Sequence, residues 1–362
     1  MGLFKDMLGS GESIFRDPVP LDYDYIPKLV PYREAQQKQI SLCMKPLVEK
    51  RNGRNIFIHG PPGVGKSVVC RHLLKALEEE DIENAEDIVP IYINCWKKNT
   101  FFKITLEICD VLGYKFTHNK KSEELFNIIK DMLNKKSVVF VLDEVDKLEE
   151  QDFIYNILEE VYRKAVVLIT NNREWIVELD QRIKSRLTAE MLEFKPYSKE
   201  ETTGILKERL KYAFVHGTWD DDAFKIAAEK TFQMGDIRAG LYLIKEAGNI
   251  AEEQSSKKVI AEHVKRAIAK FDEFNIKKKE ELEDESKFML EVIKKNSGKK
   301  IGDLYKEYQK EGGKAVYKTF QRKVESLAKS KFISVKKITG GAEGSTTIIT
   351  HAGSVKKLTD FE

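Results

Sequence analysis

The sequence predicts an α/β protein built on a doubly wound parallel sheet, followed by an all-helical domain and a small basic domain. Three features of the 362-residue chain predict this fold class. Strand-like and helical runs alternate from Leu21 to about Phe194, only helical patterns occur from Tyr197 to about Phe274, and basic residues gather in the last quarter of the chain.

The alternating part, residues 21–195, is expected to contain five parallel strands after a tail at residues 1–20. Each strand is a short apolar run between turn signals, at residues 56–58, 89–93, 138–142, 166–170 and 189–194. Amphipathic stretches between them predict helices at 69–79, 101–113, 123–135 and 154–164. Parallel strands need such crossover helices, so this order favours a doubly wound sheet.

The apolar pattern of residues 196–275 predicts helices throughout. Apolar residues recur at helical spacing over 199–212, 221–231, 237–252 and 260–269, with Gly217 and Gly235 at turns. The charge run at 276–286 is interpreted as a linker, although its composition also fits a solvated helix end.

The last domain, residues 287–362, has the element order of a winged helix. Helices are expected at 288–296, 301–309 and 315–329, and a hairpin joins strands at 332–338 and 345–350. This segment carries 17 Lys and Arg against 8 Asp and Glu, whereas the first 286 residues have a net charge of −6. A basic excess confined to one domain is typical of a nucleic-acid-binding module.

A phosphate-binding loop follows the first strand. Its residues are Gly60, Pro61, Pro62, Gly63, Val64, Gly65, Lys66 and Ser67, and Val68 continues into the next helix. Glycines let backbone N–H groups surround phosphates, the helix N-terminus attracts negative charge, and Lys66 reaches the terminal phosphates. We therefore expect nucleoside triphosphate binding, with the Ser67 hydroxyl as a Mg²⁺ ligand.

Two carboxylates follow the most apolar strand. Residues 138–142 form an unbroken apolar run, typical of a central strand, and Asp143 and Glu144 follow it. Phosphoryl transfer needs a carboxylate to hold Mg²⁺ and a group to orient water, so we assign these tasks to Asp143 and Glu144 respectively. The alternative, a solvated acidic turn, would be preferred for the pair without a phosphate-binding loop.

Other classes of protein fit poorly. No stretch approaches twenty apolar residues, and the N-terminus lacks a secretory signal, so a cytoplasmic protein without a membrane role is expected. The cysteines at 43, 70, 95 and 109 show neither zinc-ligand nor disulfide spacing and are expected to fill the core.

Five motifs stand in the order found in AAA+ ATPases, and the chain resembles this family. They are the loop at 60–67, the carboxylates at 143–144, Thr170-Asn171-Asn172, Ser185-Arg186-Leu187 and Gly235-Asp236-Ile237-Arg238. In the family these are Walker A, Walker B, sensor 1, arginine finger and sensor 2. The resemblance implies an AAA+ P-loop domain, a helical lid domain, and ATP or ADP with Mg²⁺ as cofactors.

Within AAA+ proteins, nearly the whole chain resembles the archaeal origin-recognition and replication-initiator proteins. The matching segments are residues 13–17, 24–27, 31–34, 180–187, 197–198 and 319–327. The resemblance implies a nucleoid-associated initiator, switched by ATP, that binds double-stranded origin DNA. Its implied protein partners are the replicative helicase and a paralogous initiator subunit or a second copy on DNA.

The resemblance also implies roles for single residues. Asn171 would align water, Arg238 would reach the terminal phosphate from the lid, and Arg186 would act on a neighbouring subunit's nucleotide, so that a lone monomer hydrolyses ATP slowly. Adenine would lie between the lead-in and the lid, at Val30, Arg33, Tyr197 and Ile205. Taken singly, Arg186 and Arg238 would be read as surface salt bridges.

Some positions depart from the family pattern. Tyr32 stands where the family usually has His, Ser67 where Thr is common, and Asn172 follows Asn171 where Asp is more usual. The first two changes are chemically mild. The segment 96–113, where the family carries a DNA-contacting helix, cannot be matched residue by residue and supports a DNA role only weakly.

The predicted DNA-binding residues lie on the helix at 315–329 and on the hairpin. Lys318, Thr319, Arg322 and Lys323 are spaced to face one groove, while Val316, Phe320, Val324 and Leu327 recur toward a core. On the hairpin, Lys336 and Lys337, with Ser345 and Thr346, flank a glycine-rich tip. The alternative is a basic face used for protein contacts.

Two other functions share parts of this pattern. A clamp-loader or Holliday-junction type AAA+ motor would carry the same nucleotide motifs but turn over rapidly and form rings. A STAND-type P-loop regulator would use its winged helix differently and lacks the finger and the lid motif at these positions.

Overall fold

The structure, a computed structural model, describes residues 13–79, 87–329, 333–338 and 346–351. It divides into two compact units, Met1–Ala267 and Ile268–Glu362, which are described separately below. The first unit contains the sheet domain and the helices predicted as a lid, and the second contains the predicted winged helix.

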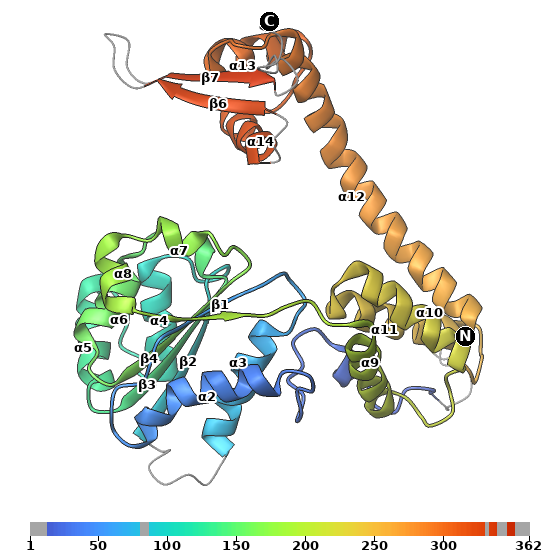
Figure 1. Cartoon of the computed structure of the whole chain (residues 1–362), viewed down its shortest axis with the longest axis horizontal. Helices are drawn as coiled ribbons and strands as arrows, with labels where there is room; N and C mark the ends of the chain where they lie inside the picture. Colours follow the sequence, from blue (N-terminus) through green and yellow to red (C-terminus); the bar gives the residue numbers. More distant parts are fainter. Residues whose placement is uncertain (1–12, 80–86, 330–332, 339–345, 352–362) are drawn as a thin grey trace, which may run out of the picture. The chain divides into compact units, whose positions relative to one another are not determined.

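The sheet has five parallel strands in the order β2-β3-β4-β1-β5 (Figure 1). Their bounds are Ile56–His59 (β1), Ile88–Asn94 (β2), Ser137–Asp143 (β3), Lys164–Thr170 (β4) and Glu190–Glu193 (β5). All five predicted strands are confirmed within two residues at each end. β3 is an interior strand, between β2 and β4, and it is buried at every position, as its apolar sequence predicted.

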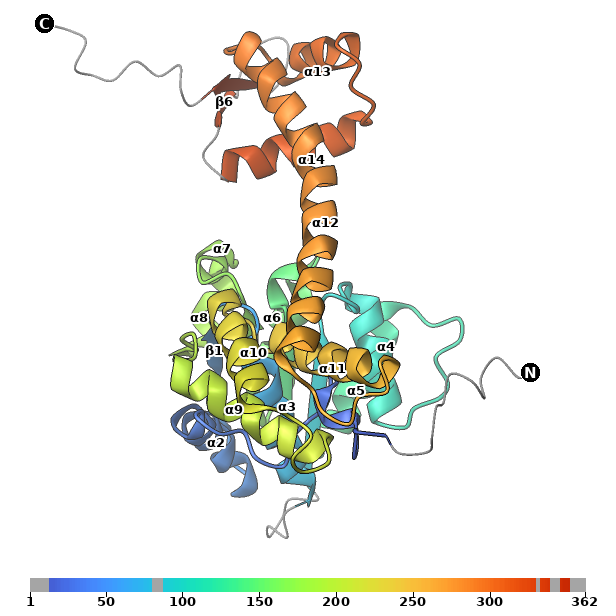
Figure 2. The same cartoon turned by 90° about the vertical axis from the view of Figure 1, so that its right-hand side faces the viewer.

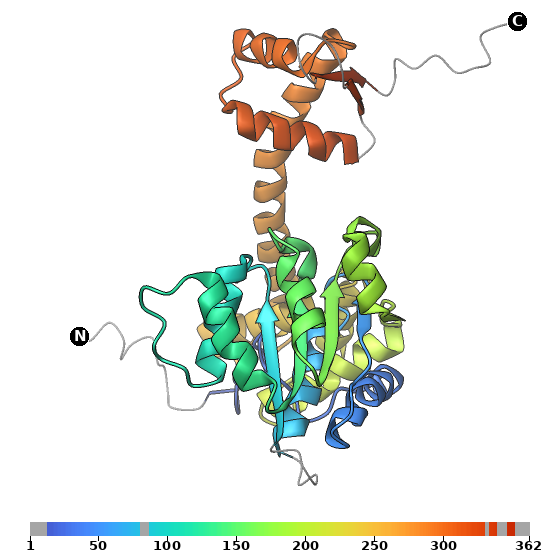
Figure 3. The same cartoon turned by 90° about the vertical axis from the view of Figure 1, so that its left-hand side faces the viewer.

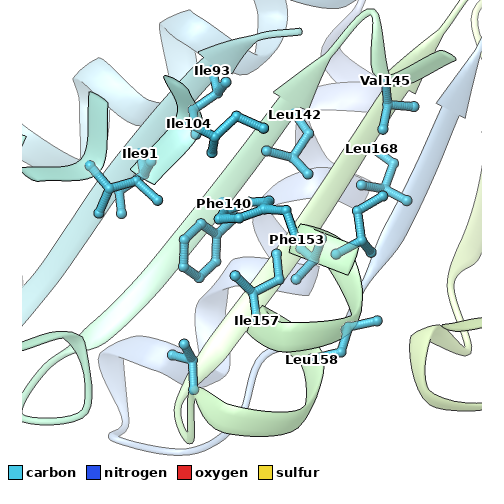
Figure 4. Close-up of a cluster of buried hydrophobic side chains, with 14 of the residues drawn as sticks. Ile91, Ile93, Ile104, Phe140, Leu142, Val145, Phe153, Ile157, Leu158 and Leu168 are labelled. Atoms are coloured by element: carbon cyan, nitrogen blue, oxygen red, sulfur yellow. The ribbon is translucent and has the colours of Figure 1, made fainter. Parts of the chain in front are cut away.

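Helices cover both faces of the sheet (Figure 3), which confirms the doubly wound prediction. One face packs against α2 (Glu34–Val48) and α3 (Lys66–Glu79) through residues such as Val139 and Val141. The other face carries Phe140 and Leu142, which pack against Ile104 and Phe153 (Figure 4). The helices on that face are α4 (Phe101–Val111), α5 (Ser122–Leu133), α6 (Asp152–Glu160), α7 (Trp175–Glu178) and α8 (Gln181–Leu187). The short turn η3 (Val145–Lys147) follows β3.

The lid helices α9 (Lys199–Ala213), α10 (Asp221–Met234) and α11 (Ile237–Glu253) pack side by side (Figures 1 and 2). Ser198 begins α9 with a capping box, since its hydroxyl accepts the Glu201 N–H while the Glu201 carboxylate accepts the Ser198 N–H. Gly235 ends α10 with a φ of 66°, and Asp236 then caps α11. This turn places Arg238 in the first turn of α11.

Residues 13–21 of the N-terminal lead-in attach to the lid. Phe15 packs against Phe214 with ring centroids 4.5 Å apart, and the short helix η1 (Val19–Leu21) packs against α9 and α11. The Glu252 carboxylate accepts hydrogen bonds from the Ser13 hydroxyl and the Ile14 N–H. The sequence prediction of a tail therefore missed a segment that braces the lid.

Helix α12 (Ala261–Lys295) runs without interruption through the predicted linker at 276–286, so the backbone of that segment is helical. The second unit continues with α13 (Ile301–Lys310), α14 (Tyr317–Lys329) and the antiparallel strands β6 (Ile333–Ile338) and β7 (Thr346–His351). This is the predicted winged-helix order. Its core includes Tyr308, Phe320 and Val324. Val316 is 67% exposed because it precedes α14 and accepts N–H groups of its first turn, so its predicted core position is wrong.

All four cysteines are buried in the two cores of the sheet domain, as predicted. In the described part of the chain, no helix is long and apolar enough to cross a membrane.

Replacing Phe140 by Ala should destabilise the sheet domain by about 3–5 kcal/mol, because the fully buried ring would leave a cavity in the core of Figure 4. Thermal unfolding followed by circular dichroism measures the loss. Tyr162→Ala is the matched control, since Tyr162 is 70% exposed and its loss should change stability by less than about 0.5 kcal/mol. Equal unfolding midpoints for the two variants would contradict the assigned core.

Candidate nucleotide site

The predicted phosphate-binding loop connects the end of β1 to the start of α3. Gly60, Gly63 and Gly65 have φ angles of 152°, 75° and 90°, a backbone region that residues with a Cβ rarely adopt. A Cβ at Gly60 would also lie 2.2 Å from the carbonyl oxygen of Phe194. All three glycines are thus required by conformation, and Gly60 is also required by space. Helix α3 begins at Lys66, directly behind the loop.

Lys66 is the central residue of the site. Its buried amine donates to the carbonyl oxygens of Gly60 and Pro61, each at 2.8 Å, and to Asn171 Oδ1 at 2.7 Å. Burial lowers the pKa of Lys66 to about 8, although the nearby carboxylates of Asp143 and Glu144 oppose this shift. The amine is therefore held close to the carboxylates with all three N–H donors satisfied.

Asn171, at the end of β4, joins Lys66 to Glu144. Its amide nitrogen donates to both Glu144 carboxylate oxygens, at 3.0 and 3.1 Å, while its oxygen accepts from Lys66. Glu144 has a left-handed backbone with φ of 54°, which turns the chain sharply after β3. Three predicted site residues from separate segments are thus brought together by one hydrogen-bonded chain.

Asp143 is 3% exposed and both of its carboxylate oxygens accept hydrogen bonds. Oδ1 accepts the Glu144 N–H at 2.9 Å, and Oδ2 accepts the Tyr92 hydroxyl at 2.5 Å. Burial and the charge of Asp143 raise the pKa of Tyr92, which keeps its phenol protonated as a donor. Sequence analysis missed Tyr92, whose only signal was a polar atom inside an otherwise apolar strand.

The lid reaches the loop through the turn before α11. A Cβ on Gly63 would lie 2.1 Å from the Asp236 carboxylate, and one on Gly65 would lie 2.7 Å from the Tyr197 hydroxyl. Arg238 binds Asp236 through its Nε and one terminal nitrogen, at 3.1 and 2.9 Å. This pairing raises the pKa of Arg238, and the charges of Glu144 and Asp143 add to the effect. The predicted lid arginine therefore lies within the electrostatic field of the Walker B carboxylates.

Arg33 is a structural clasp beside the predicted adenine position. It is 4% exposed, and its guanidinium donates to the carbonyl oxygens of Val64 at 3.2 Å and Lys195 at 2.7 Å. The same group stacks 3.8 Å from the centroid of the Tyr197 ring. Val30 and Ile205 are buried, at 9% and 8% exposure. Arg33 thus ties the phosphate-binding loop to the segment that enters the lid, a function that sequence reasoning did not identify.

Arg186 belongs to a different part of the sheet domain. It lies on α8, forms a salt bridge with Glu159 of α6, and its guanidinium lies 5.0 Å from the centroid of Tyr155. Within this chain Arg186 therefore makes the salt bridge that was the alternative interpretation of the residue. Arg238 also forms such a salt bridge, with Asp236 of the same turn.

The predicted DNA-binding residues are in the second unit. Lys318 and Arg322 are exposed on α14, and Thr319 and Lys323 are half-buried on the same helix. Lys336 and Lys337 lie in β6 and Thr346 begins β7, but their side chains are outside the described part, as is Ser345 entirely. In the first unit, Trp96 is 67% exposed, and the Lys147 amine lies 5.4 Å from its ring centroid.

The residues present fit a Mg²⁺-nucleotide. The fit depends on three observations: a loop whose glycines adopt positive φ angles, a fixed amine, and a buried carboxylate at the end of β3. Ser67 in the first turn of α3 and Asp143 would hold the metal ion.

Residues 49–172 match the family described as "AAA domain", and residues 203–269 match the "Cdc6 AAA+ ATPase-type lid domain". ORC1-type DNA replication protein 1 of Sulfurisphaera tokodaii is 35% identical over 270 residues, which cover 71% of this chain and 67% of that protein. The protein of the same name from Archaeoglobus fulgidus is 30% identical over 344 residues, or 90% of this chain and 84% of that protein.

The chain belongs to the family of ORC1-type DNA replication proteins.

Solved structures agree with this assignment. The Orc1 protein of Aeropyrum pernix, in complex with DNA, matches with a TM-score of 0.70 and 25% identity over 94% of both chains. Cdc6p from Pyrobaculum aerophilum has the same fold, with a TM-score of 0.64 at 20% identity over 94% of this chain and 95% of that one. The predicted AAA+ fold with a helical lid is therefore confirmed for this ORC1-type protein.

Gly63→Ala in this ORC1-type protein should weaken nucleotide binding by about tenfold or more, because a Cβ at positive φ would be strained and would displace Asp236. Titration with a fluorescent ATP analogue measures the effect. Gly113→Ala is the matched control, since Gly113 has a φ of 73° with open space around its Cα. Nucleotide affinities that are equal in the two variants would refute the lid contact as part of the site.

Proposed function

We propose that this ORC1-type protein is an ATP-switched replication initiator that binds double-stranded DNA at an origin. It would mark the origin and help to recruit or load the replicative helicase, together with a paralogous initiator or a second copy of itself. The observation that carries the proposal is the lid turn before α11, in which Asp236 lies against Gly63 of the phosphate-binding loop and binds Arg238. A nucleotide bound there would interact with both domains, so its state would set the lid angle.

The hydrogen bonds of the site support the hydrolytic roles proposed for its residues. Mg²⁺, when bound with ATP, neutralises phosphate charge and orients the terminal phosphate. Lys66 binds the terminal phosphates, Glu144 orients and polarises the attacking water, and Asn171 fixes the Glu144 carboxylate through its amide nitrogen. Because Asn171 also accepts a hydrogen bond from Lys66, it fixes the position of the Lys66 amine relative to the Glu144 carboxylate.

Arg186 would act on the nucleotide of a neighbouring subunit. A guanidinium supplied in trans stabilises the charge that spreads over the transferred phosphate. In this chain Arg186 is paired with Glu159, so trans action requires exchange of that salt bridge. We therefore propose that the isolated chain hydrolyses ATP slowly, as a switch rather than a motor.

DNA binding is proposed for α14 and the β6–β7 hairpin, through Lys318, Thr319, Arg322, Lys323, Lys336 and Lys337. The exposed positions of Lys318 and Arg322 support this, as does the DNA complex of the related Aeropyrum pernix Orc1. The sheet domain would contribute further contacts to the duplex. Phosphate contacts of this kind make affinity steeply dependent on salt.

The proposal is tested by binding the protein to fragments of its own genome at near-physiological salt, with ATP and with ADP, followed by footprinting. We expect the protein to protect discrete repeats in one intergenic region. The strength or extent of this protection should differ between ATP and ADP. Binding spread evenly over all fragments would instead favour the alternative function, a AAA+ loader or motor.

Lys66→Ala should weaken ATP binding strongly, because it removes the charge that meets the terminal phosphates. Glu144→Gln should retain ATP binding but reduce hydrolysis, because the carboxylate that polarises water is lost. Equilibrium binding and single-turnover hydrolysis measure the two effects separately. Hydrolysis at the parent rate by the Glu144 variant would contradict the assignment of Glu144.

Arg322→Ala should weaken duplex binding and lower its salt dependence while leaving nucleotide affinity unchanged, because Arg322 lies in the second unit. Fluorescence anisotropy with labelled duplex and nucleotide titration give the two affinities. Lys310→Ala is the control, since Lys310 is an exposed cation on α13 that pairs with Glu307. A parallel loss of DNA and nucleotide affinity would show that the two functions are not separable.

A further inference from the structure

We propose that Tyr92 is a positioning residue for the Mg²⁺ of the nucleotide site, because its hydroxyl fixes the carboxylate of Asp143. The inference rests on the proposed function, in which Asp143 holds that ion. Tyr92 belongs to none of the sequence motifs of the site, and it reaches Asp143 from the neighbouring strand.

The contact depends on the register of β2 and β3. Asn94 is the parallel partner of Asp143, and Tyr92 is the partner of Val141. Side chains alternate between the two faces of a sheet, so Tyr92, Asn94 and Asp143 all lie on the face covered by α2 and α3. From that face the long tyrosine side chain extends toward the end of β3, where its hydroxyl donates to Asp143 Oδ2 at 2.5 Å.

Tyr92 is itself held in place. β2 is an edge strand, which tolerates Pro90 two residues before Tyr92. The ring packs against the core on this face, and the guanidinium of Arg71 on α3 lies 5.6 Å from its centroid. Because the ring is fixed by packing, the hydroxyl is directed at one carboxylate oxygen.

The two hydrogen bonds determine the orientation of the Asp143 carboxylate. Oδ1 accepts the Glu144 N–H and Oδ2 accepts the Tyr92 hydroxyl, so rotation of the group would break both bonds. Each carboxylate oxygen has a second lone pair, which remains for the metal ion or for a water molecule bound to it. Side chains that hydrogen-bond to a metal ligand typically contribute about 10–100-fold to metal affinity or activity.

The test separates metal affinity from nucleotide affinity. Binding of a fluorescent ATP analogue is measured in EDTA and over a Mg²⁺ titration, for the parent protein and Tyr92→Phe. The Mg²⁺ concentration for half-maximal tightening should rise about tenfold in the variant, while affinity in EDTA stays within about twofold. Tyr114→Phe, which removes a hydroxyl from a half-buried tyrosine of the other core, should match the parent.

A second measurement does not depend on the folding of Tyr92→Phe. Replacing Tyr92 by a mono-fluorinated tyrosine keeps the hydroxyl, and the variant should retain the parent Mg²⁺ response. Its fluorine NMR resonance should move when Mg²⁺ is added to the nucleotide-bound protein. A resonance that does not move would overturn the inference.

The possible outcomes separate the inference from the proposed function. A parent protein that binds nucleotide without any Mg²⁺ effect would overturn both. A parent that responds to Mg²⁺, with Tyr92→Phe responding identically, would overturn only the role of Tyr92. Equal losses in EDTA and in Mg²⁺ would show that the hydroxyl supports the fold rather than the metal, and would also overturn it.

Discussion

The buried amine of Lys66 is the constraint on which the nucleotide site depends. An ammonium group removed from water must have its three donors satisfied, and here the acceptors are Gly60, Pro61 and Asn171. These bonds fix the phosphate-binding loop to the end of β4. Asn171 also donates to the Glu144 carboxylate, so the phosphate-binding amine of Lys66 and the water-orienting carboxylate of Glu144 belong to one hydrogen-bonded unit.

The lid adds a second layer to this unit. Asp236 lies against Gly63 and Tyr197 lies against Gly65 of the phosphate-binding loop. The negative charges of Asp143 and Glu144 act on Arg238. Arg33 connects the loop to the segment that enters the lid. In the lead-in, Phe15 packs against Phe214 of the lid and the Ile14 N–H donates to Glu252. A change at the terminal phosphate can therefore be transmitted to the lid through contacts already present around the loop.

Much of the fold could be predicted from sequence because its signals are local. Apolar runs such as 138–142 identify strands, and Gly63, Lys66 and Glu144 belong to contiguous motifs with a known spacing. The clasp of Arg33, the Tyr92 contact and the docking of Phe15 could not be predicted, because each joins segments that only the tertiary fold brings together. The predicted core position of Val316 was wrong for a different reason, because helical spacing does not show where a helix begins.

The central claim is that nucleotide sets the position of the lid through Arg238. Because the native cysteines are buried, spin labels can be placed selectively at Asp131→Cys in the sheet domain and Lys211→Cys in the lid, both exposed positions. Pulsed electron paramagnetic resonance should give different distance distributions with ATP and with ADP in a background that does not hydrolyse ATP. The difference should disappear in Arg238→Ala. The same distribution with both nucleotides would contradict the account.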